Sequence, residues 1–300
     1  MNFYDSDDEL TNPDKYFENM WNKKQDKFNA YINNLQNDTE LINLNHHGMP
    51  EIPDLSRFYK LKILNMNDNR VKKIPFLPVS LIDFTCENNL LEELPELPNH
   101  LQSLVCGNNK LREIPKLPEK LEILRCEFNE ISELPEFNSK LKQVHCNNNK
   151  LKWLPKFNDD LVFIMCNNNQ ITTLPKLNAK LEQISCNFNF VQHFPNLHSA
   201  LKYVYCNSNP LQYLPKANEK LTNLDFYCLK TPVGDKLKTY LVGEKFINII
   251  NGFEDKNDIG EKTEICKVCQ INQSMNLHML ECMNICYDCK DTFLDKCEIN

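Results

Sequence analysis

Apolar positions recur along the middle of the chain with a fixed period of 20 residues. The repeating unit reads L-x-x-L-x-C-x-x-N-x-L-x-x-L-P-x-L-x-x-x, and seven regular copies open at Leu81, Leu101, Leu121, Leu141, Leu161, Leu181 and Leu201. A copy with Met66 in place of the cysteine starts at Leu61, a decayed copy with Phe226 starts at Leu221, and a 22-residue version fits residues 39–60. Because self-similarity at a constant period indicates stacked structural units, the pattern predicts a repeat solenoid over residues 39–230.

Each unit divides into a strand and a return segment. Positions 3 to 7 alternate with a period of two, which is typical of a β-strand. We expect positions 1, 4, 6, 11 and 14 to form the shared core, and positions 3, 5 and 7 to point outward. One strand from each unit then joins a parallel sheet that lines a concave face. The return segment carries a proline and is too short for a helix, so it should run extended.

Asparagine and cysteine each form a column through the repeats. The asparagines stand where the chain leaves the strand, at Asn69, Asn89, Asn109, Asn129, Asn149, Asn169, Asn189 and Asn209. We expect their amides to bond backbone groups that the bend leaves unpaired. The cysteines are Cys86, Cys106, Cys126, Cys146, Cys166, Cys186 and Cys206. Core packing is favoured over a disulfide or metal ladder, because free cysteine behaves as a small buried hydrophobe and no histidine or acid joins the column.

Two segments that flank the repeats are predicted caps. Residues 13–36 carry apolar side chains at helical spacing after Asn12-Pro13, which predicts a helix that covers the first open sheet edge. A partner-binding or targeting helix is the alternative. The expected organisation is an N-terminal helical cap (1–38), the repeats (39–230), a C-terminal cap at 236–251 with a linker (231–262 together), and a small terminal module (263–300).

Composition narrows the environment and the partners. Of the 300 residues 41% are hydrophobic, which allows a sizeable core, and the net charge is −7. Lysine and arginine are scattered, so no nucleic-acid partner is expected. The acidic amino terminus lacks the apolar core of a signal peptide, and no stretch reaches the length of a membrane span. We therefore expect an intracellular, cytoplasmic protein with reduced thiols and no membrane partner.

Six of the 14 cysteines fall in the last 35 residues. Cys266 with Cys269 and Cys286 with Cys289 give C-x2-C-x16-C-x2-C, a spacing typical of tetrahedral zinc sites. So short a module cannot bury enough apolar surface to fold unaided, and one structural zinc ion would supply the missing free energy. The alternative is a disordered tail with unbound thiols.

The 20-residue unit resembles the leucine-rich repeat, and the resemblance covers about two thirds of the chain. The recurring L-P-x-L-P, as in Leu94 to Pro98 and Ile114 to Pro118, is most similar to the short repeats of bacterial type III secreted effectors. Similar repeats occur in amoebae and in the giant DNA viruses that infect them. The resemblance implies an α/β-type solenoid that binds a protein on its concave sheet, and host cytoplasm as the location if the protein is viral.

The terminal module resembles a RING finger, particularly that of inhibitor-of-apoptosis proteins. By that resemblance Cys266, Cys269, Cys286 and Cys289 make one complete zinc site, and Val268 contributes to a hydrophobic spot for a ubiquitin-conjugating enzyme.

The second zinc site of the RING pattern is incomplete. Cys282, Cys297 and His278 would supply three ligands in an unusual order, and the arginine that follows the last ligand in RING ligases is absent. The resemblance therefore implies a single-zinc, degenerate RING-like module, for which binding or dimerisation without ligase activity is the rival role.

The outward strand positions 3 and 5 are the candidate partner-binding surface. Side chains typical of protein-binding hot spots gather there in the later repeats, at Arg125, His145, Phe163, Met165, Tyr203 and Tyr205. Phe128 and Phe188 stand nearby at position 8. Alternatively, position 8 turns inward and the tyrosines lean on neighbouring repeats.

No Ser-His-Asp set, phosphate loop, paired acid motif or open metal site occurs in the sequence, so active-site catalysis is not expected. The sequence favours intracellular protein–protein recognition by the concave face. The alternative is a RING-type E3 ubiquitin ligase subunit whose repeats choose the substrate.

Overall fold

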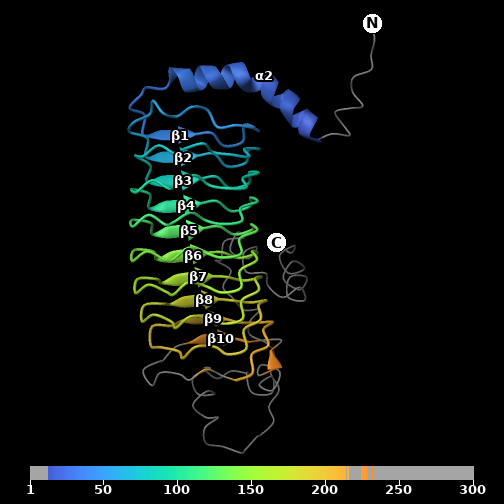
Figure 1. Cartoon of the computed structure of the whole chain (residues 1–300), viewed down its shortest axis with the longest axis vertical. Helices are drawn as coiled ribbons and strands as arrows, with labels where there is room; N and C mark the ends of the chain where they lie inside the picture. Colours follow the sequence, from blue (N-terminus) through green and yellow to red (C-terminus); the bar gives the residue numbers. More distant parts are fainter. Residues whose placement is uncertain (1–12, 214, 216–223, 229–230, 233–300) are drawn as a thin grey trace, which may run out of the picture. The chain divides into compact units, whose positions relative to one another are not determined.

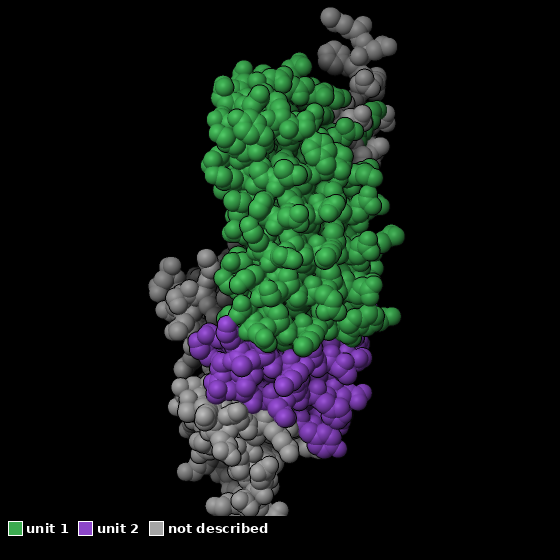
Figure 2. Space-filling model, turned by 60° about the vertical axis from the view of Figure 1, so that its left-hand side comes forward, with its two compact units in different colours: residues 1–164 green, residues 165–300 purple. Residues whose placement is uncertain are grey.

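The computed structural model describes residues 13–213, 215, 224–228 and 231–232. The predicted C-terminal cap, the linker and the RING-like zinc module lie outside the described residues. The chain divides into two compact units, residues 1–164 and 165–300, which Figure 2 distinguishes by colour.

Ten short strands follow one another in chain order in a parallel sheet (Figure 1). They are β1 (Leu41–Asn43), β2 (Ile63–Asn65), β3 (Asp83–Thr85), β4 (Ser103–Val105), β5 (Ile123–Arg125), β6 (Gln143–His145), β7 (Phe163–Met165), β8 (Gln183–Ser185), β9 (Tyr203–Tyr205) and β10 (Asp225–Tyr227). Paired residues stand one repeat apart, as Leu104 with Leu124 in the first unit and Ile184 with Val204 in the second. The predicted solenoid with one strand per repeat is confirmed.

The core forms where the repeat predicts it. In the repeat that opens at Leu101, Leu104, Cys106 and Leu111 are fully buried and Ile114 is 5% exposed. Position 17 is buried as well, which the sequence did not predict; its residues include Leu77, Leu97, Leu117, Phe157, Leu177 and Leu197. The return segments therefore add a further apolar column, and no helix occurs between residues 35 and 213.

Position 7 was expected to point outward, and this prediction is wrong for several repeats. Glu127, Asn147, Asn167 and Asn187 are all at most 5% exposed. The strand alternation ends before the bend at position 8, which is left-handed (φ +52° to +57°) at Asp68, Asn88, Asn108, Phe128, Asn148, Asn168, Phe188 and Ser208. At Asn167 and Asn187 the position 7 amide instead turns along the sheet, where its oxygen accepts the N–H of the next repeat at 2.8 Å.

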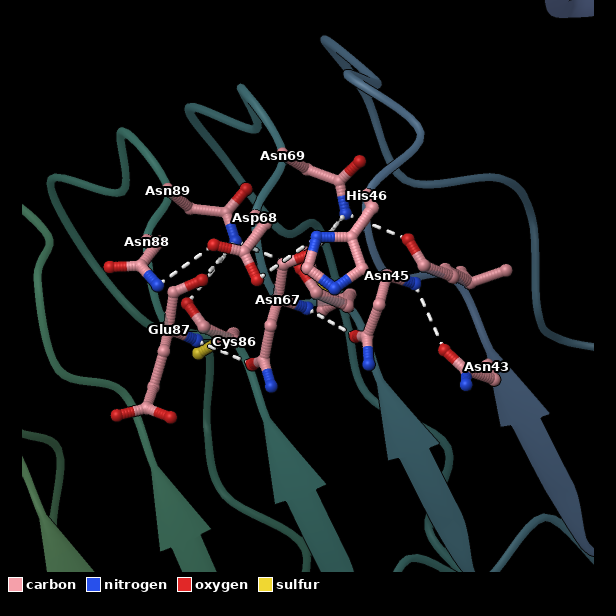
Figure 3. Close-up of polar contacts among 12 residues, drawn as sticks. Asn43, Asn45, His46, Asn67, Asp68, Asn69, Cys86, Glu87, Asn88 and Asn89 are labelled. Carbon is pink, nitrogen blue, oxygen red and sulfur yellow. Dashed lines mark hydrogen bonds and ion pairs between the residues drawn. The ribbon is translucent and has the colours of Figure 1, made fainter. Parts of the chain in front are cut away.

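The position 9 asparagines bond backbone groups of two repeats at once, as Asn89 illustrates in Figure 3. Its Nδ2 donates to the carbonyl of Met66 in the preceding repeat at 2.9 Å, and to those of Cys86 at 3.2 Å and Glu87 at 3.1 Å. Its Oδ1 accepts the N–H of Val71 at 3.1 Å. The predicted structural role is confirmed, and the same pattern recurs at Asn109, Asn129, Asn189 and Asn209.

The cysteine column packs into the core. All eight described cysteines, the seven of the column and Cys228, are free thiols and buried. Burial raises the pKa of the Cys186 thiol to about 12 and that of Cys228 to about 11. At Cys106 burial again raises the pKa most, and the neighbouring thiols of Cys86 and Cys126 add to it. The thiols therefore stay protonated at neutral pH and serve as small apolar side chains.

The amino-terminal cap is a helix, α2 (Pro13–Asn34), which Figure 1 shows across the end of the sheet beside β1. Its Phe28 is buried and lies edge-on to the ring of His47, with centroids 5.2 Å apart. The guanidinium of Arg57 donates to the carbonyl of Ile32 in the last turn. Within the described residues, α2 included, no helix has the length and apolar character needed to cross a bilayer.

Candidate functional site

Three of the predicted binding residues come together on the outward side of the first unit's strands. Arg125 of β5 and His145 of β6 are register partners, so their side chains leave the sheet next to each other. The ring of Phe163 stacks on that of His145, with centroids 5.2 Å apart and an interplanar angle of 30°. All three side chains are half-buried. They form a continuous surface across three strands.

A fourth member, Glu127, was missed by the sequence analysis. It is 3% exposed, and its Oε1 accepts a hydrogen bond from Arg125 Nη2 at 3.1 Å. We call Arg125, Glu127, His145 and Phe163 the strand cluster. The signal in the sequence was a break in the repeat, because Glu127 occupies position 7, which is asparagine at 67, 147, 167, 187 and 207.

Position 7 normally carries a second asparagine ladder, visible in Figure 3. The side-chain oxygen of Asn45 accepts the N–H of Asn67 at 2.7 Å, and that of Asn67 accepts the N–H of Glu87 at 2.8 Å. Glycine at 107 has no side chain to continue the ladder. A Cβ at Gly107 would lie 3.3 Å from Glu87 Oε1 and 3.4 Å from Glu127 Cγ, so the glycine makes room for both glutamate side chains.

Burial sets the charges of the strand cluster. It raises the pKa of the Glu127 carboxyl, which the adjacent Arg125 partly offsets, and Glu87 raises it further. Burial also lowers the pKa of His145 to about 4, and the Arg125 guanidinium lowers it as well. The imidazole is therefore neutral at neutral pH, and Arg125 is the cationic member of the cluster.

The second unit places its three predicted binding residues differently. Met165 is 1% and Tyr205 8% exposed, so the prediction that both are accessible is wrong, whereas Tyr203 is 41% exposed. Tyr205 lies flat against Tyr227 of the next strand, with ring centroids 4.7 Å apart and an interplanar angle of 3°. Side chains at equal positions on paired strands are close enough to cover each other, so the alternative of tyrosines leaning on neighbouring repeats holds for Tyr205.

The two position 8 phenylalanines point outward, so the alternative of an inward turn is wrong. Phe128 is 43% and Phe188 39% exposed. Their φ angles are 56° and 54°, a conformation that asparagine tolerates and a bulky side chain does not favour. Each of these two phenylalanines is therefore exposed to solvent at a backbone conformational cost of about 1 kcal/mol.

Within the described residues, no group of three or more histidine, cysteine, aspartate or glutamate side chains could hold a metal ion. The predicted zinc ligands Cys266, Cys269, Cys286 and Cys289, and the doubtful set of Cys282, Cys297 and His278, lie outside those residues. The zinc site thus stays a prediction from the sequence.

Comparison with known proteins gives a fold and no sequence family. No protein-family model matches the chain. No curated protein matches it either.

Several solved structures share the solenoid. YopM from Yersinia enterocolitica matches with a TM-score of 0.59 and 24% identity over 66% of this chain and 48% of its own. YopM of Yersinia pestis, a leucine-rich effector protein, matches with a TM-score of 0.52 and 27% identity over 73% of this chain and 60% of its own. The leucine-rich repeat domain of APL1B matches with a TM-score of 0.55 and 19% identity over 64% of each chain. These neighbours are leucine-rich repeat proteins, and the chain spans about half to three fifths of the YopM chains.

Proposed function

We propose that the chain is a protein-recognition scaffold whose outward strand face, around the strand cluster, binds a protein partner. The likeness to leucine-rich repeat structures, one of them an effector protein, supports a scaffold for protein–protein interaction. The buried positions keep the same residue types from repeat to repeat, whereas the outward positions 3 and 5 vary widely between repeats. A constant core that presents a variable outward strand surface is suited to specific recognition.

The observation that carries this proposal is the contact of Arg125, His145 and Phe163 across three adjacent strands. Arginine and aromatic side chains dominate protein-binding hot spots, because they bury large areas at modest entropic cost. Here the stacking of Phe163 on His145 already restricts both rings before a partner arrives.

The test is capture of partners from cells of the native host by the full chain and by Phe163→Ala. We expect the variant to lose capture at least tenfold, since a hot-spot truncation costs about 2 kcal/mol or more. Trp153→Ala is the matched control, because Trp153 is 49% exposed but stands outside the strands. Equal loss in both variants, or a large drop in the melting temperature of Phe163→Ala, would count against the proposed face.

The finer assignments also remain proposals. The repeat type of the bacterial effectors, the cytoplasmic location and one structural zinc ion held by Cys266, Cys269, Cys286 and Cys289 rest on the sequence. Four thiolates are a suitable donor set for tetrahedral zinc.

The alternative function, a RING-type E3 ubiquitin ligase subunit that binds a ubiquitin-conjugating enzyme, rests on the same terminal cysteines. Autoubiquitination by the full chain with a panel of conjugating enzymes tests it, and Cys286→Ser should abolish any chains that form. Absence of chains with every enzyme would leave recognition as the function.

A further inference from the structure

An open cavity of about 470 Å³ lies where the chain enters the strands from β2 onward in the first unit. Most of its lining residues stand directly before or after a repeat-opening leucine, which is itself buried. No residue of the strand cluster lines it. We call this cavity the basic groove and define it by Lys60, Lys62, Ser80, Ile82, His100 and Lys120.

Two residues without charge form the floor of the groove. The residue before the opening leucine has a long basic side chain in other repeats of the first unit, at Lys60, His100, Lys120 and Lys140. In the repeat that opens at Leu81 it is Ser80, whose hydroxyl donates to the carbonyl of Leu61 at 2.7 Å and so turns toward the backbone. Ser80 and Ile82 are half-buried, whereas the basic side chains on both sides are exposed. The groove therefore has a partly apolar floor between two basic walls.

The wall formed by His100 and Lys120 has no carboxylate bonded to it within the described residues. Lys120 Nζ lies 3.0 Å from His100 Nδ1. An ammonium has no lone pair, so Lys120 donates this bond and the hydrogen of a neutral imidazole is on Nε2. The remaining ammonium hydrogens and this Nε2–H are donors for an anionic group in the groove.

The opposite wall has two lysines in solvent-exposed ion pairs. Lys62 Nζ lies 2.6 Å from Glu40 Oε1, and Lys60 Nζ lies 3.5 Å from Asp38 Oδ2. All four side chains are about half exposed, and ion pairs at such sites contribute little to stability. A carboxylate in the groove can therefore bind these lysines with little loss. Tyr59 is 64% exposed beside them and adds apolar surface.

The charge of the groove selects an anionic ligand. Among its lining residues three are lysine and one is glutamate, although the whole chain has a net charge of −7. A nucleic acid is a poor fit, because its affinity comes from many phosphate contacts along a basic stripe and its backbone gains nothing from an apolar floor. An acidic peptide can use both the lysines and Ile82.

The length of the groove fits an extended peptide. Lys60 and Lys120 are three repeats apart, which corresponds to about 14 Å at the usual spacing of strands. In an extended peptide, residues four positions apart lie about 13 Å apart on the same face, and the residue midway between them shares that face. Two carboxylates at this spacing can each reach one wall while the middle side chain packs over Ile82.

We infer that the basic groove is a docking site for an extended acidic segment of a protein partner, in which two carboxylates flank an apolar side chain. The groove and the strand cluster are separate surfaces, so this inference goes beyond the proposed function and does not depend on it.

The probe is a phage-displayed library of random linear peptides, selected in parallel on the full chain and on its Lys120→Glu variant. We expect the unmodified chain alone to enrich peptides with two acidic residues four positions apart and an apolar residue midway. The dissociation constant of one such synthetic peptide is then measured by fluorescence anisotropy.

Three variants separate the charge of the groove from its shape. Lys120→Glu reverses one charge on a wall and should weaken peptide binding at least about tenfold. Ser80→Lys adds a positive charge but fills the floor, with a residue that the same position carries in other repeats, and should also weaken binding about tenfold. Lys152→Glu is the matched control, because Lys152 is exposed outside the strands, and it should change the constant less than about twofold.

The remaining outcomes would overturn the inference. Tighter binding to Ser80→Lys, or equal weakening by Lys120→Glu and Lys152→Glu, would mean that net charge alone attracts the peptide. Enrichment of peptides without acidic residues, or of none, would also overturn it. A single-stranded DNA oligonucleotide that binds the groove more tightly than the peptide would assign it to nucleic acid instead. Phe163→Ala should bind the acidic peptide unchanged, so the capture experiment tests the proposed function separately.

Discussion

At the scale of single residues, the asparagine side chain at position 9 satisfies the backbone groups that each bend leaves unpaired. Asn189 Nδ2 donates to the carbonyls of Cys166 and Cys186 at 3.0 Å, and Oδ1 accepts the N–H of Ile171 at 3.0 Å. An amide carries a donor and an acceptor at a fixed spacing, so it can satisfy backbone groups of two repeats that no regular ladder reaches. Asparagine is therefore needed at this position for its geometry as well as its polarity.

Asn189→Ala should lower the free energy of unfolding by about 2–4 kcal/mol, because several buried backbone groups lose their partner together. The measurement is urea unfolding. Asn168→Gly is the control, since position 168 has a φ of 53°, which glycine adopts readily, and we expect a change below about 1 kcal/mol. Similar losses in both variants would contradict the bridging role of position 9.

His145 should make stability depend on pH. Its pKa is lowered from 6.5 to about 4 in the native state. In the unfolded chain the imidazole is therefore protonated below pH 6.5, whereas in the native state it stays neutral down to about pH 4. The free energy of unfolding should therefore fall across that window, by up to about 3 kcal/mol from this residue.

His145→Gln should remove this part of the pH dependence, as urea unfolding of both proteins across the window would reveal. The raised pKa of Glu127 acts in the opposite sense, since the native carboxyl takes up a proton before the unfolded one, but it acts in both proteins. Parallel stability curves for the two proteins would contradict a buried neutral imidazole.

At the scale of the element, each repeat contributes a strand of three residues. The burial of the inward side chains could be predicted from the sequence, whereas the exposure of the outward side chains could be predicted only in part. Alternation along one strand identified the buried core, and Arg125, His145 and Phe163 do meet across strands. The same alternation could not reveal that Tyr205 is covered by Tyr227, because that contact depends on the neighbouring strand. It also could not place Glu127, which follows the end of β5 and is buried beside Arg125.

The cysteine column gives a prediction at this scale. With the pKa of Cys186 raised to about 12, iodoacetamide should alkylate the native column at least about a thousandfold more slowly than an ordinary thiol. Peptide mapping by mass spectrometry identifies the modified positions, and denaturation should expose all seven cysteines from Cys86 to Cys206. Rapid native alkylation of any of them would contradict core packing.

At the scale of the whole molecule, one short sequence pattern, repeated along the chain, builds a parallel sheet in which each strand pairs with its neighbours in chain order. The fold could therefore be predicted from the 20-residue period alone, because a repeated local pattern has few ways to bury its leucines. The terminal cysteines form no repeated pattern. The predicted metal site therefore depends on the spacing of a single set of ligands at residues 266–289.

Native mass spectrometry of the full chain should find one zinc ion. Cys286→Ser should lose it, because a tetrahedral site cannot lose a thiolate without a large drop in affinity, whereas Cys297→Ser should retain it. A chelator should remove the ion and leave the far-UV signal of the repeats almost unchanged. Two ions per chain, or none, would contradict the single-zinc module.

The central claim, that the outward strand face around Phe163 grips a protein, is tested most directly by site-specific photo-crosslinking. A benzoyl-phenylalanine is placed at Phe163 or at Trp153 of the full chain, and cells of the native host are irradiated. We predict one crosslinked partner protein from position 163 and none from position 153. Equal crosslinking from both positions, or a product from 153 alone, would contradict the claim.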